Sequence, residues 1–352
     1  MGSWLAATAV VLFGQVGVFY LYAYRCALTS ANGASDPSAL RALVVSDVHL
    51  LGKRRRTWIE RIWIDWQITI ALQAANHAHA PEIVLVLGDQ LDEGGYPTSD
   101  EDWQEYTSRF TQAMASLRGK ETLFLMGNHD AAFGRYLTKA GMQRYELAFG
   151  PANRLMTVKG HKIIHLNTMA LDTDVKDPEV RAQAASFLQT LETLEPEEDT
   201  SVVLLTHLPL FRNDDLLCGP VRSQEGGHIT YEHPSFRYSP FHHVLSRQLS
   251  SQLLTTIRPS VVLSGHTHAW CEYDHTEVNA KEFTIPAFSW GQRPDPSYGV
   301  LHLSGRHATV TTCSLPTETH LFALYGISIL LFVAKLIWRA STRRLVREKK
   351  DT

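Results

Sequence analysis

The stretch "VVLSGHTHAW", residues 261–270, places two histidines one residue apart directly after an apolar run. The apolar run is typical of a buried strand. In an extended segment residues i and i+2 point to the same side, so we expect His266 and His268 to face one small volume at the carboxyl end of that strand. Two solvated loop histidines are the alternative interpretation. The rest of the chain decides between this alternative and a metal site.

Five further runs rich in Val, Ile and Leu precede this one, with longer segments between them. They are ALVVSD (42–47), EIVLVLGD (82–89), ETLFLMGN (121–128), KIIHLN (162–167) and SVVLLTH (201–207). Residues 57–75 have apolar and aromatic side chains at helical intervals, which we assign to packing. Alternating strands and helices predict an α/β fold. Three later runs, residues 282–290, 298–304 and 308–315, have no helix between them and suggest an antiparallel part.

Side chains able to bind metals follow five of these six runs. They are Asp47 and His49, Asp89, Asn128 and His129, His207, and the pair His266 and His268. Ligands of open α/β sheets gather beyond the carboxyl ends of the strands, so five separate segments favour one metal site. Gly88, Gly127 and Gly265 precede ligands, where the backbone must bend closely.

Taken together, "SDVH", "GDQLD", "GNHD", "TH" and "GHTH" resemble, in this order, the five signatures of the calcineurin-like metallophosphoesterases. The resemblance implies a four-layer αββα fold, a β-sandwich flanked by helices. It implies two metal sites that share Asp89: the first with Asp47, His49 and His268, the second with Asn128, His207 and His266. A set of oxygen and imidazole ligands without thiolate suits manganese, iron or zinc. The family suggests two Mn²⁺ ions.

The resemblance also implies a reaction. A hydroxide between the two metals attacks phosphorus, and His129 protonates the leaving group. Asp92 resembles the carboxylate that orients His129, and we expect Asp130 to support the loop. Structural packing is the alternative for His129, and capping of a turn is the alternative for Asp92.

Both ends of the chain are apolar. Residues 4–24 carry no formal charge, and residues 321–338 contain one lysine near their end. Each stretch is about long enough to cross a bilayer. A cleaved signal peptide is the alternative for the first, and a buried core helix for the second. The tail after the second stretch has six Lys or Arg residues, which the positive-inside rule places in the cytosol.

We therefore divide the chain into five parts. They are an N-terminal transmembrane helix (1–25), a linker (26–40), a lumenal catalytic domain (41–315), a C-terminal transmembrane helix (318–339) and a basic cytosolic tail (340–352). Both termini are then cytosolic. Lys349 and Lys350 resemble a dilysine retrieval signal, which implies the COPI coat as a partner. We expect no dimer through the spans, because neither shows small-residue pairing.

The four cysteines predict at most one bridge. With Cys26 at the edge of the first span, Cys218, Cys271 and Cys313 allow one disulfide and one free thiol in a lumenal domain. The sequence does not choose the pair. The absence of C-x-x-C spacing argues against a zinc-thiolate site. A net charge of −3 gives no sign of a nucleic-acid partner.

A narrower resemblance concerns the substrate. "GDQLDEG", "LSGHTHAWCEYDH" and "IPAFSWGQRPDPSYG" resemble the metallophosphoesterase 1 branch, membrane-anchored enzymes that remodel glycosylphosphatidylinositol (GPI) anchors. This implies removal of an ethanolamine-phosphate side branch from a mannose of the anchor glycan, with GPI-anchored proteins as partners. We expect the second mannose as the target. The implied location is the endoplasmic reticulum, the intermediate compartment and the Golgi membrane, where the reaction promotes export.

Several alternatives stay open at this point. The chain could act on the first mannose, or be a lumenal phosphatase for another phosphomonoester or phosphoprotein. It could also be a non-enzymatic cargo receptor, although all seven metal-binding positions are present.

The long connection at residues 212–243 is a candidate substrate-binding segment. His228 could contact phosphate or glycan, and Asp214 could attract the ethanolamine ammonium group. Trp270 and Trp290 could stack on sugars. The alternatives are ordinary surface positions for the histidine and core packing for the tryptophans.

Overall fold

The computed structural model describes residues 8–30, 39–95, 97–172, 175–193, 200–225 and 233–348. His228 and the lysine pair Lys349 and Lys350 lie outside these ranges, so the predictions that concern them stay predictions.

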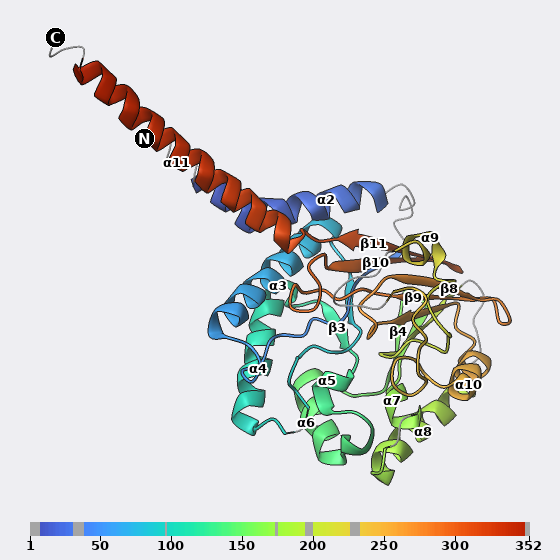
Figure 1. The fold of residues 1–352 in the computed structure, drawn as a ribbon. Helices are drawn as coiled ribbons and strands as arrows, with labels where there is room; N and C mark the ends of the chain where they lie inside the picture. The colour runs from blue at the N-terminus through green and yellow to red at the C-terminus, as the bar shows by residue number, and fades with distance from the viewer. Residues whose placement is uncertain are drawn as a thin grey trace.

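Two β-sheets pack against each other (Figure 1). The first has the order β11-β10-β1-β2-β3, and its strands are β1 (Leu40–Val45), β2 (Ile83–Val86), β3 (Glu121–Phe124), β10 (Ser297–Ser304) and β11 (His307–Ser314). The second has the order β4-β5-β6-β7-β9-β8, with β4 (Arg154–Val158), β5 (His161–His165), β6 (Val202–Leu205), β7 (Val261–Ser264), β8 (Cys271–His275) and β9 (Ala280–Thr284). The six predicted runs form β1, β2, β3, β5, β6 and β7.

Strand direction places the site. β1, β2 and β3 are parallel to one another, and so are β5, β6, β7 and β9. The antiparallel pairs are β1 with β10, β10 with β11, β4 with β5, and β8 with β9. The expected antiparallel part is therefore present in β10 and β11, while β9 is antiparallel to β8 and parallel to β7. All strands that carry candidate ligands still end at the same edge of the sandwich.

The alternation of side chains along each strand explains the layers. In β1, Leu40, Ala42 and Val44 point into the core between the two sheets. The intervening Leu43 and Val45 belong to the core beneath the helices. Both faces are therefore apolar, as expected for a strand buried on both sides.

Helices cover the outer faces of the sheets and give the four-layer αββα arrangement. In Figure 1, α3 and α4 lie on one side of the sandwich and α7, α8 and α10 on the other. The elements are α3 (Trp58–His79), α4 (Asp100–Ala113), η3 (Met114–Leu117), α5 (Asn128–Ala131), η4 (Gly134–Tyr136), α6 (Lys139–Phe149), α7 (Thr168–Asp172), α8 (Pro178–Leu191), α9 (Gly219–Ser223) and α10 (Arg247–Ile257). The helix predicted at residues 57–75 is α3, whose start is fixed by a capping box between Thr57 and Glu60.

Two helices at the ends are long and apolar enough to cross a membrane, Thr8–Thr29 and Glu318–Thr342. The first contains η1 (Phe13–Gly17) and most of α2 (Val18–Ser30), and the second belongs to α11 (Glu318–Glu348). Only 6% of the most apolar part of α11 is buried, so a core helix does not explain it. These helices favour membrane association.

α2 packs on the domain through Phe19 and Ala23, which are both fully buried, and its position corrects two predictions. The helix continues to Ser30, so residues 26–30 are not linker. Cys26 forms a disulfide with Cys313 of β11, and Cys218 pairs with Cys271. The expected single bridge with one free thiol is therefore wrong, because the helix brings Cys26 from the edge of the span down to β11.

Candidate metal centre and active site

The candidate ligands of both sheets meet in two adjacent clusters. The first contains Asp47, His49 and His268, and the second contains Asp89, His207 and His266. Within each cluster the ligand atoms lie within 4.8 Å of one another. Asn128, in the first turn of α5, belongs beside the second cluster. All seven predicted ligands therefore come together.

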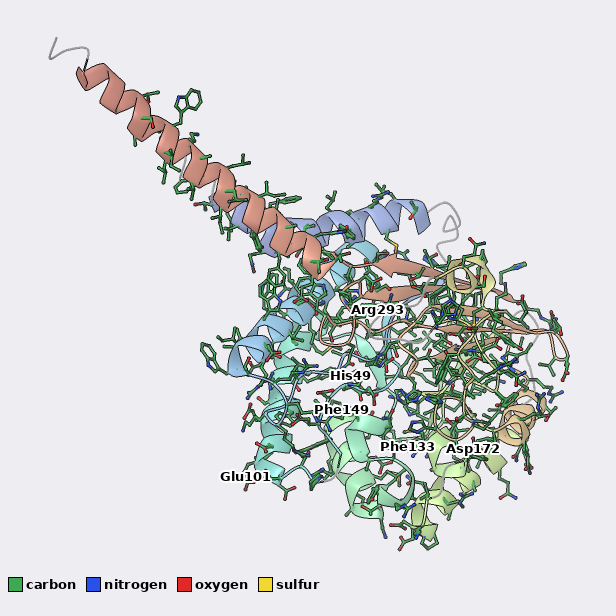
Figure 2. The ribbon with its side chains drawn as sticks, in the orientation of Figure 1. His49, Glu101, Phe133, Phe149, Asp172 and Arg293 are labelled. Atoms are coloured by element: carbon green, nitrogen blue, oxygen red, sulfur yellow. A yellow bond between two sulfur atoms is a disulfide. The ribbon has the colours of Figure 1, made fainter. Side chains whose placement is uncertain are left out.

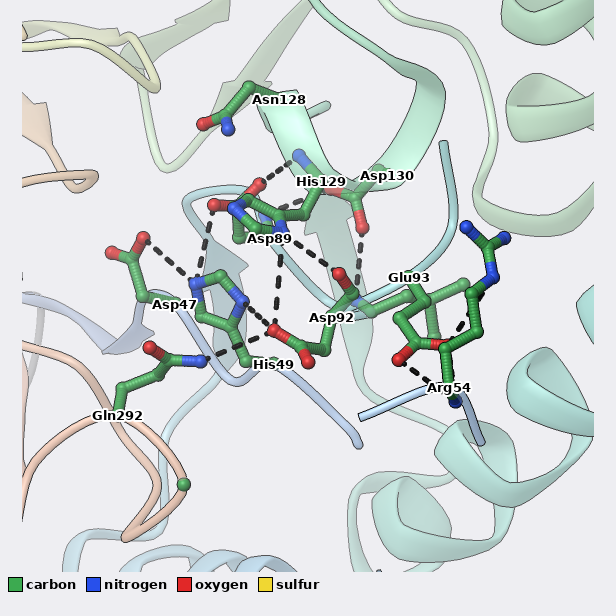
Figure 3. Close-up of polar contacts among 12 residues, drawn as sticks. Asp47, His49, Arg54, Asp89, Asp92, Glu93, Asn128, His129, Asp130 and Gln292 are labelled. Carbon is green, nitrogen blue, oxygen red and sulfur yellow. Dashed lines mark hydrogen bonds and ion pairs between the residues drawn. The ribbon is translucent and has the colours of Figure 1, made fainter. Parts of the chain in front are cut away.

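Asp89 lies between the two clusters. Its Oδ2 is 3.3 Å from Nε2 of His49 (Figure 3). The same oxygen is 3.4 Å from Nε2 of His207. On the first side, Oδ1 of Asp47 is 3.4 Å from Nε2 of His268. On the second side, Oδ1 of Asn128 is 3.0 Å from Nε2 of His207 and 2.9 Å from Nδ1 of His266. This central position is the one that a bridging carboxylate requires.

Two buried atoms in the first cluster show that the residues fit cations. Oδ1 of Asp47 and Nε2 of His49 have no hydrogen-bond partner among the described residues. Both residues are almost completely buried. A buried polar atom without a partner is costly, so such atoms aimed into one space favour an ion there.

The backbone is shaped to bring the ligands this close. Five of the seven have positive φ, a conformation that is strained for non-glycine residues: Asp47 (50°), His49 (44°), Asp89 (52°), His266 (70°) and His268 (59°). The predicted role of the glycines is confirmed. A Cβ on Gly127 would lie 2.2 Å from Oδ1 of Asp89, and one on Gly265 would lie 2.0 Å from Oγ of Ser46.

Outer hydrogen bonds orient the imidazoles. Nδ1 of His207 donates to the carbonyl of Leu87 at 2.8 Å, which leaves the lone pair of Nε2 facing the cluster. Nδ1 of His49 lies 3.2 Å from the carboxylate of Asp92, so its Nε2 also faces the cluster. The carbonyl of His268 accepts a 2.6 Å hydrogen bond from Arg293.

The pKa values of the clustered histidines and aspartates are those expected of a site that binds cations. Burial would lower the pKa of His49, yet the carboxylates of Asp89, Asp47 and Asp92 raise it to about 10. Burial would also lower the pKa of His207, but the charge of Asp89 outweighs burial and raises this pKa to about 9. The pKa values of Asp47 and Asp89 stay well below their usual range despite burial, because histidines surround them. Divalent cations take the place of these protons when they bind.

Asp92 contacts His129 in a way the sequence does not predict. Nδ1 of His129 donates to the backbone carbonyl of Asp92 at 2.8 Å, whereas the carboxylate is 3.9 Å away. The carboxylate instead holds His49 and accepts from Gln292 at 3.3 Å (Figure 3). The side chain of Asp92 therefore positions a metal ligand, and its backbone positions the candidate acid.

Asp130 supports the loop, as expected. Its carboxylate accepts hydrogen bonds from the backbone N–H groups of Asp89, Leu91 and Gly127 at 2.8 to 3.0 Å. These contacts join the loop after β2 to the loop after β3. Burial, together with the charge of Asp89, raises the pKa of Asp130 to about 8.

A cavity of about 590 Å³ opens beside the metal clusters. Asn128, His129 and Asp92 line it at the metal side. The remaining lining residues include Arg54, Arg55, Arg135, Tyr136 and Phe241. The exposed side of His129 thus faces a space large enough for a substrate, as a proton donor to a leaving group requires.

The three predicted substrate contacts that the structure describes, Trp270, Trp290 and Asp214, do not line this cavity. Trp290 is buried, donates to the carbonyl of Pro316 and stacks on Trp63, so it is a core residue. Trp270 packs against Phe283. Asp214 pairs with Arg237 at 2.9 Å, which offsets its charge. The alternative of core packing is thus the correct one for Trp290.

Other residues at the site cannot be recognised from the sequence motifs. Arg54, Arg55 and Arg135 carry no signature motif, and only the folded chain brings them to the cavity. The backbone of His242, in the long connection, accepts a 2.8 Å hydrogen bond from Nε2 of His266. The run Arg54–Arg56 before α3 is a sequence signal for a basic surface, and it could have identified the first two of these arginines.

Comparisons with known proteins agree with this geometry. Residues 40–270 match the calcineurin-like phosphoesterase family, and the chain belongs to it. Metallophosphoesterase 1 of Mus musculus is 32% identical and covers 90% of this chain and 83% of its own. The Danio rerio protein of the same name is 30% identical, with 93% and 88% covered. A solved dimetal phosphatase from Danio rerio has a TM-score of 0.50 at 13% identity and covers 80% of this chain and 100% of its own, a likeness of fold alone.

The chain is a metal-dependent hydrolase of phosphoester bonds. Two divalent metals, when bound to the two clusters, supply Lewis-acid stabilisation of phosphate oxygens and activate water. The residues of the two clusters would hold those metals, the cavity offers space for the substrate, and His129 is the candidate to protonate the leaving group. Asp92 and Leu87 keep the histidines in the required tautomers.

Proposed function

We propose that this enzyme removes an ethanolamine-phosphate side branch from a mannose of the GPI-anchor glycan, with the second mannose as the target. Its metals are Mn²⁺ ions, and it works on GPI-anchored proteins in the endoplasmic reticulum and early Golgi. Trimming at this point promotes export of those proteins.

The observation that carries the proposal is the combination of a phosphoesterase site with two terminal helices able to cross a membrane. The lipid of a GPI anchor stays in the lumenal leaflet. An enzyme tethered at both ends meets the attached glycan close to the membrane, whereas a soluble phosphatase needs no tether. The likeness to metallophosphoesterase 1 over most of the chain supports the same substrate.

The disulfides support a lumenal catalytic domain. All four cysteines are paired, and structural disulfides persist in oxidising compartments. Because Cys26 lies in α2 and bonds to β11, a retained first helix also fits this arrangement better than a cleaved signal peptide. The basic tail then lies in the cytosol, where Lys349 and Lys350 are available to the COPI coat.

The test is mass spectrometry of GPI glycans from cells that lack this protein. The cells are complemented with wild type, with Asp89→Ala, or with Glu101→Ala as a matched control. Glu101 lies on α4 at the outer edge of the domain (Figure 2). We expect one additional ethanolamine phosphate on a defined mannose in the null and Asp89→Ala cells, and its removal by wild type and Glu101→Ala.

Unchanged glycans in the null cells would exclude the GPI substrate, while the phosphoesterase chemistry would stand. Retention on the first mannose would correct the position alone. Clearance by Asp89→Ala would contradict the bridging role of that carboxylate.

A further inference from the structure

The first turn of α3 exposes three large apolar side chains. Trp58 is 69% exposed, and Ile59 and Ile62 are each 61% exposed. Ile62 is four residues after Trp58 and three after Ile59, so the three lie on one helix face. A contiguous apolar surface of this kind on a folded domain marks an interaction site.

The same helix contacts the base of α11. Trp63 stacks on Phe322 with ring centroids 5.8 Å apart, and its indole N–H donates to Glu318 at 2.8 Å. Trp63 also stacks on Trp290 in the core. Ile59 precedes Trp63 by four residues, so the exposed face of α3 is continuous with the surface that holds α11.

The arrangement of α11 identifies what covers this face. α11 extends away from the domain beside α3, and its apolar part is almost entirely uncovered (Figure 1). When α11 enters a bilayer, the residues next to its first turn lie at the level of the headgroups. Tryptophan is enriched at that level, because its ring is apolar with one polar edge.

We propose that Trp58, Ile59 and Ile62 rest in the interface of the same bilayer that α11 enters. The polar groups around them are compatible with this contact. Glu60 is held by the N-cap Thr57 and lies 3.6 Å from Arg56, which offsets its charge. Arg55 is exposed and can bind lipid phosphates.

The contact places the active-site cavity beside the bilayer. Arg54 and Arg55 line the cavity and precede Trp58 by four and three residues. Three extended residues span at most about 10 Å. A phosphoester on a lipid-linked glycan therefore reaches the cavity without leaving the surface. This consequence rests on the proposed function, whereas the membrane contact itself does not.

The experiment measures immersion depth by electron paramagnetic resonance on the full-length protein in phosphatidylcholine vesicles. Because all four native cysteines are paired, a single introduced cysteine is the sole free thiol for a spin label. Labels replace Trp58, Ile59 or Ile62 in separate variants. The matched control is Leu147→Cys, a 91% exposed apolar position on α6, far from α11 in Figure 1.

We expect labels at positions 58, 59 and 62 to collide more with oxygen than with a water-soluble nickel chelate, and the label at 147 to do the reverse. Equal access of the nickel chelate to all four would overturn the proposal. Spin–spin broadening at 58 or 62 would also overturn it, because it would show a second copy on this face.

A second experiment measures enzyme kinetics in the double variant Trp58→Ser with Ile62→Ser. We expect activity on a vesicle-embedded phosphodiester to fall about tenfold relative to activity on a soluble one, because apolar contact with the surface is lost. Leu147→Ser should leave that ratio unchanged, and an unchanged ratio in the double variant would count against the contact. Immersed labels together with unaltered GPI glycans in null cells would refute the proposed substrate alone.

Discussion

The carboxylate of Asp92 accepts a hydrogen bond from Nδ1 of His49 at 3.2 Å. The backbone carbonyl of the same residue holds His129 at 2.8 Å. Asp92 thus orients a candidate metal ligand with its side chain and the candidate acid with its backbone. The two functions can be separated by mutation, since a substitution removes only the side chain.

Asp92→Ala should lower metal affinity about 10- to 100-fold, because the imidazole of His49 loses the partner that fixes its tautomer. Isothermal titration of the metal-free protein with Mn²⁺ and Zn²⁺ measures this. Asp92→Asn serves as the conservative comparison and should lie in between. A loss of kcat at saturating metal, with unaltered affinity, would show instead that the carboxylate acts on His129.

His129→Ala should lower kcat about 10²- to 10⁴-fold for a substrate with an alkoxide leaving group, because the group that delivers the proton is lost. Its effect should be much smaller for a p-nitrophenyl ester, whose leaving group needs no proton. Metal content, measured on the same samples, should stay at the wild-type level. Equal losses on both substrates would assign His129 to packing or metal support.

Gly265→Ala should abolish metal binding and activity, since its Cβ would lie 2.0 Å from Oγ of Ser46 and 2.7 Å from Oδ2 of Asp47. The backbone then has to move, and His266 and His268 move with it. Gly326→Ala, in α11 with nothing within 4 Å of its Cβ, is the control. Metal content and kcat of the purified variants check this, and an active Gly265→Ala protein would contradict it.

The sequence predicts the site well because its signal is local. Each ligand follows its own apolar strand within a few residues, and parallel strands end at one edge, so the topology brings His49 and His268 together. The substrate side of the site has no such signal. Arg135 and Phe241 meet at the cavity only through long-range packing.

The errors in the sequence analysis have the same origin. Trp290 looks available for a sugar in the sequence, but α3 supplies Trp63 to cover it. Cys26 lies in an apolar stretch and gives no sign that α2 turns toward β11. Both depend on how a helix packs against distant parts of the chain, and the residue pattern within one segment does not contain this information.

The bond between Cys26 and Cys313 should stabilise the attachment of α2. Cys26→Ser with Cys313→Ser should lower the free energy of unfolding by about 2 to 5 kcal/mol, the range typical of native disulfides. Thermal unfolding followed by fluorescence measures the change in Tm. Peptide mapping of the non-reduced native protein should recover residues 26 and 313 in one cross-linked species, and a mature chain that begins after Cys26 would exclude the bridge and a retained first helix.

The contribution of His165 to the stability of the domain should fall as pH drops from about 6.5 to 4. Burial lowers the pKa of His165 to about 4, although Nε2 of its ring donates to the carbonyl of Pro151 at 2.8 Å. Its pKa in the unfolded chain is about 6.5. Between these values the unfolded state binds more protons, so the contribution of His165 is complete above pH 6.5 and is lost on acidification, by up to about 3 kcal/mol. His165→Gln should flatten the dependence of Tm on pH relative to the exposed control His307→Gln, and parallel curves for the two variants would contradict the assignment.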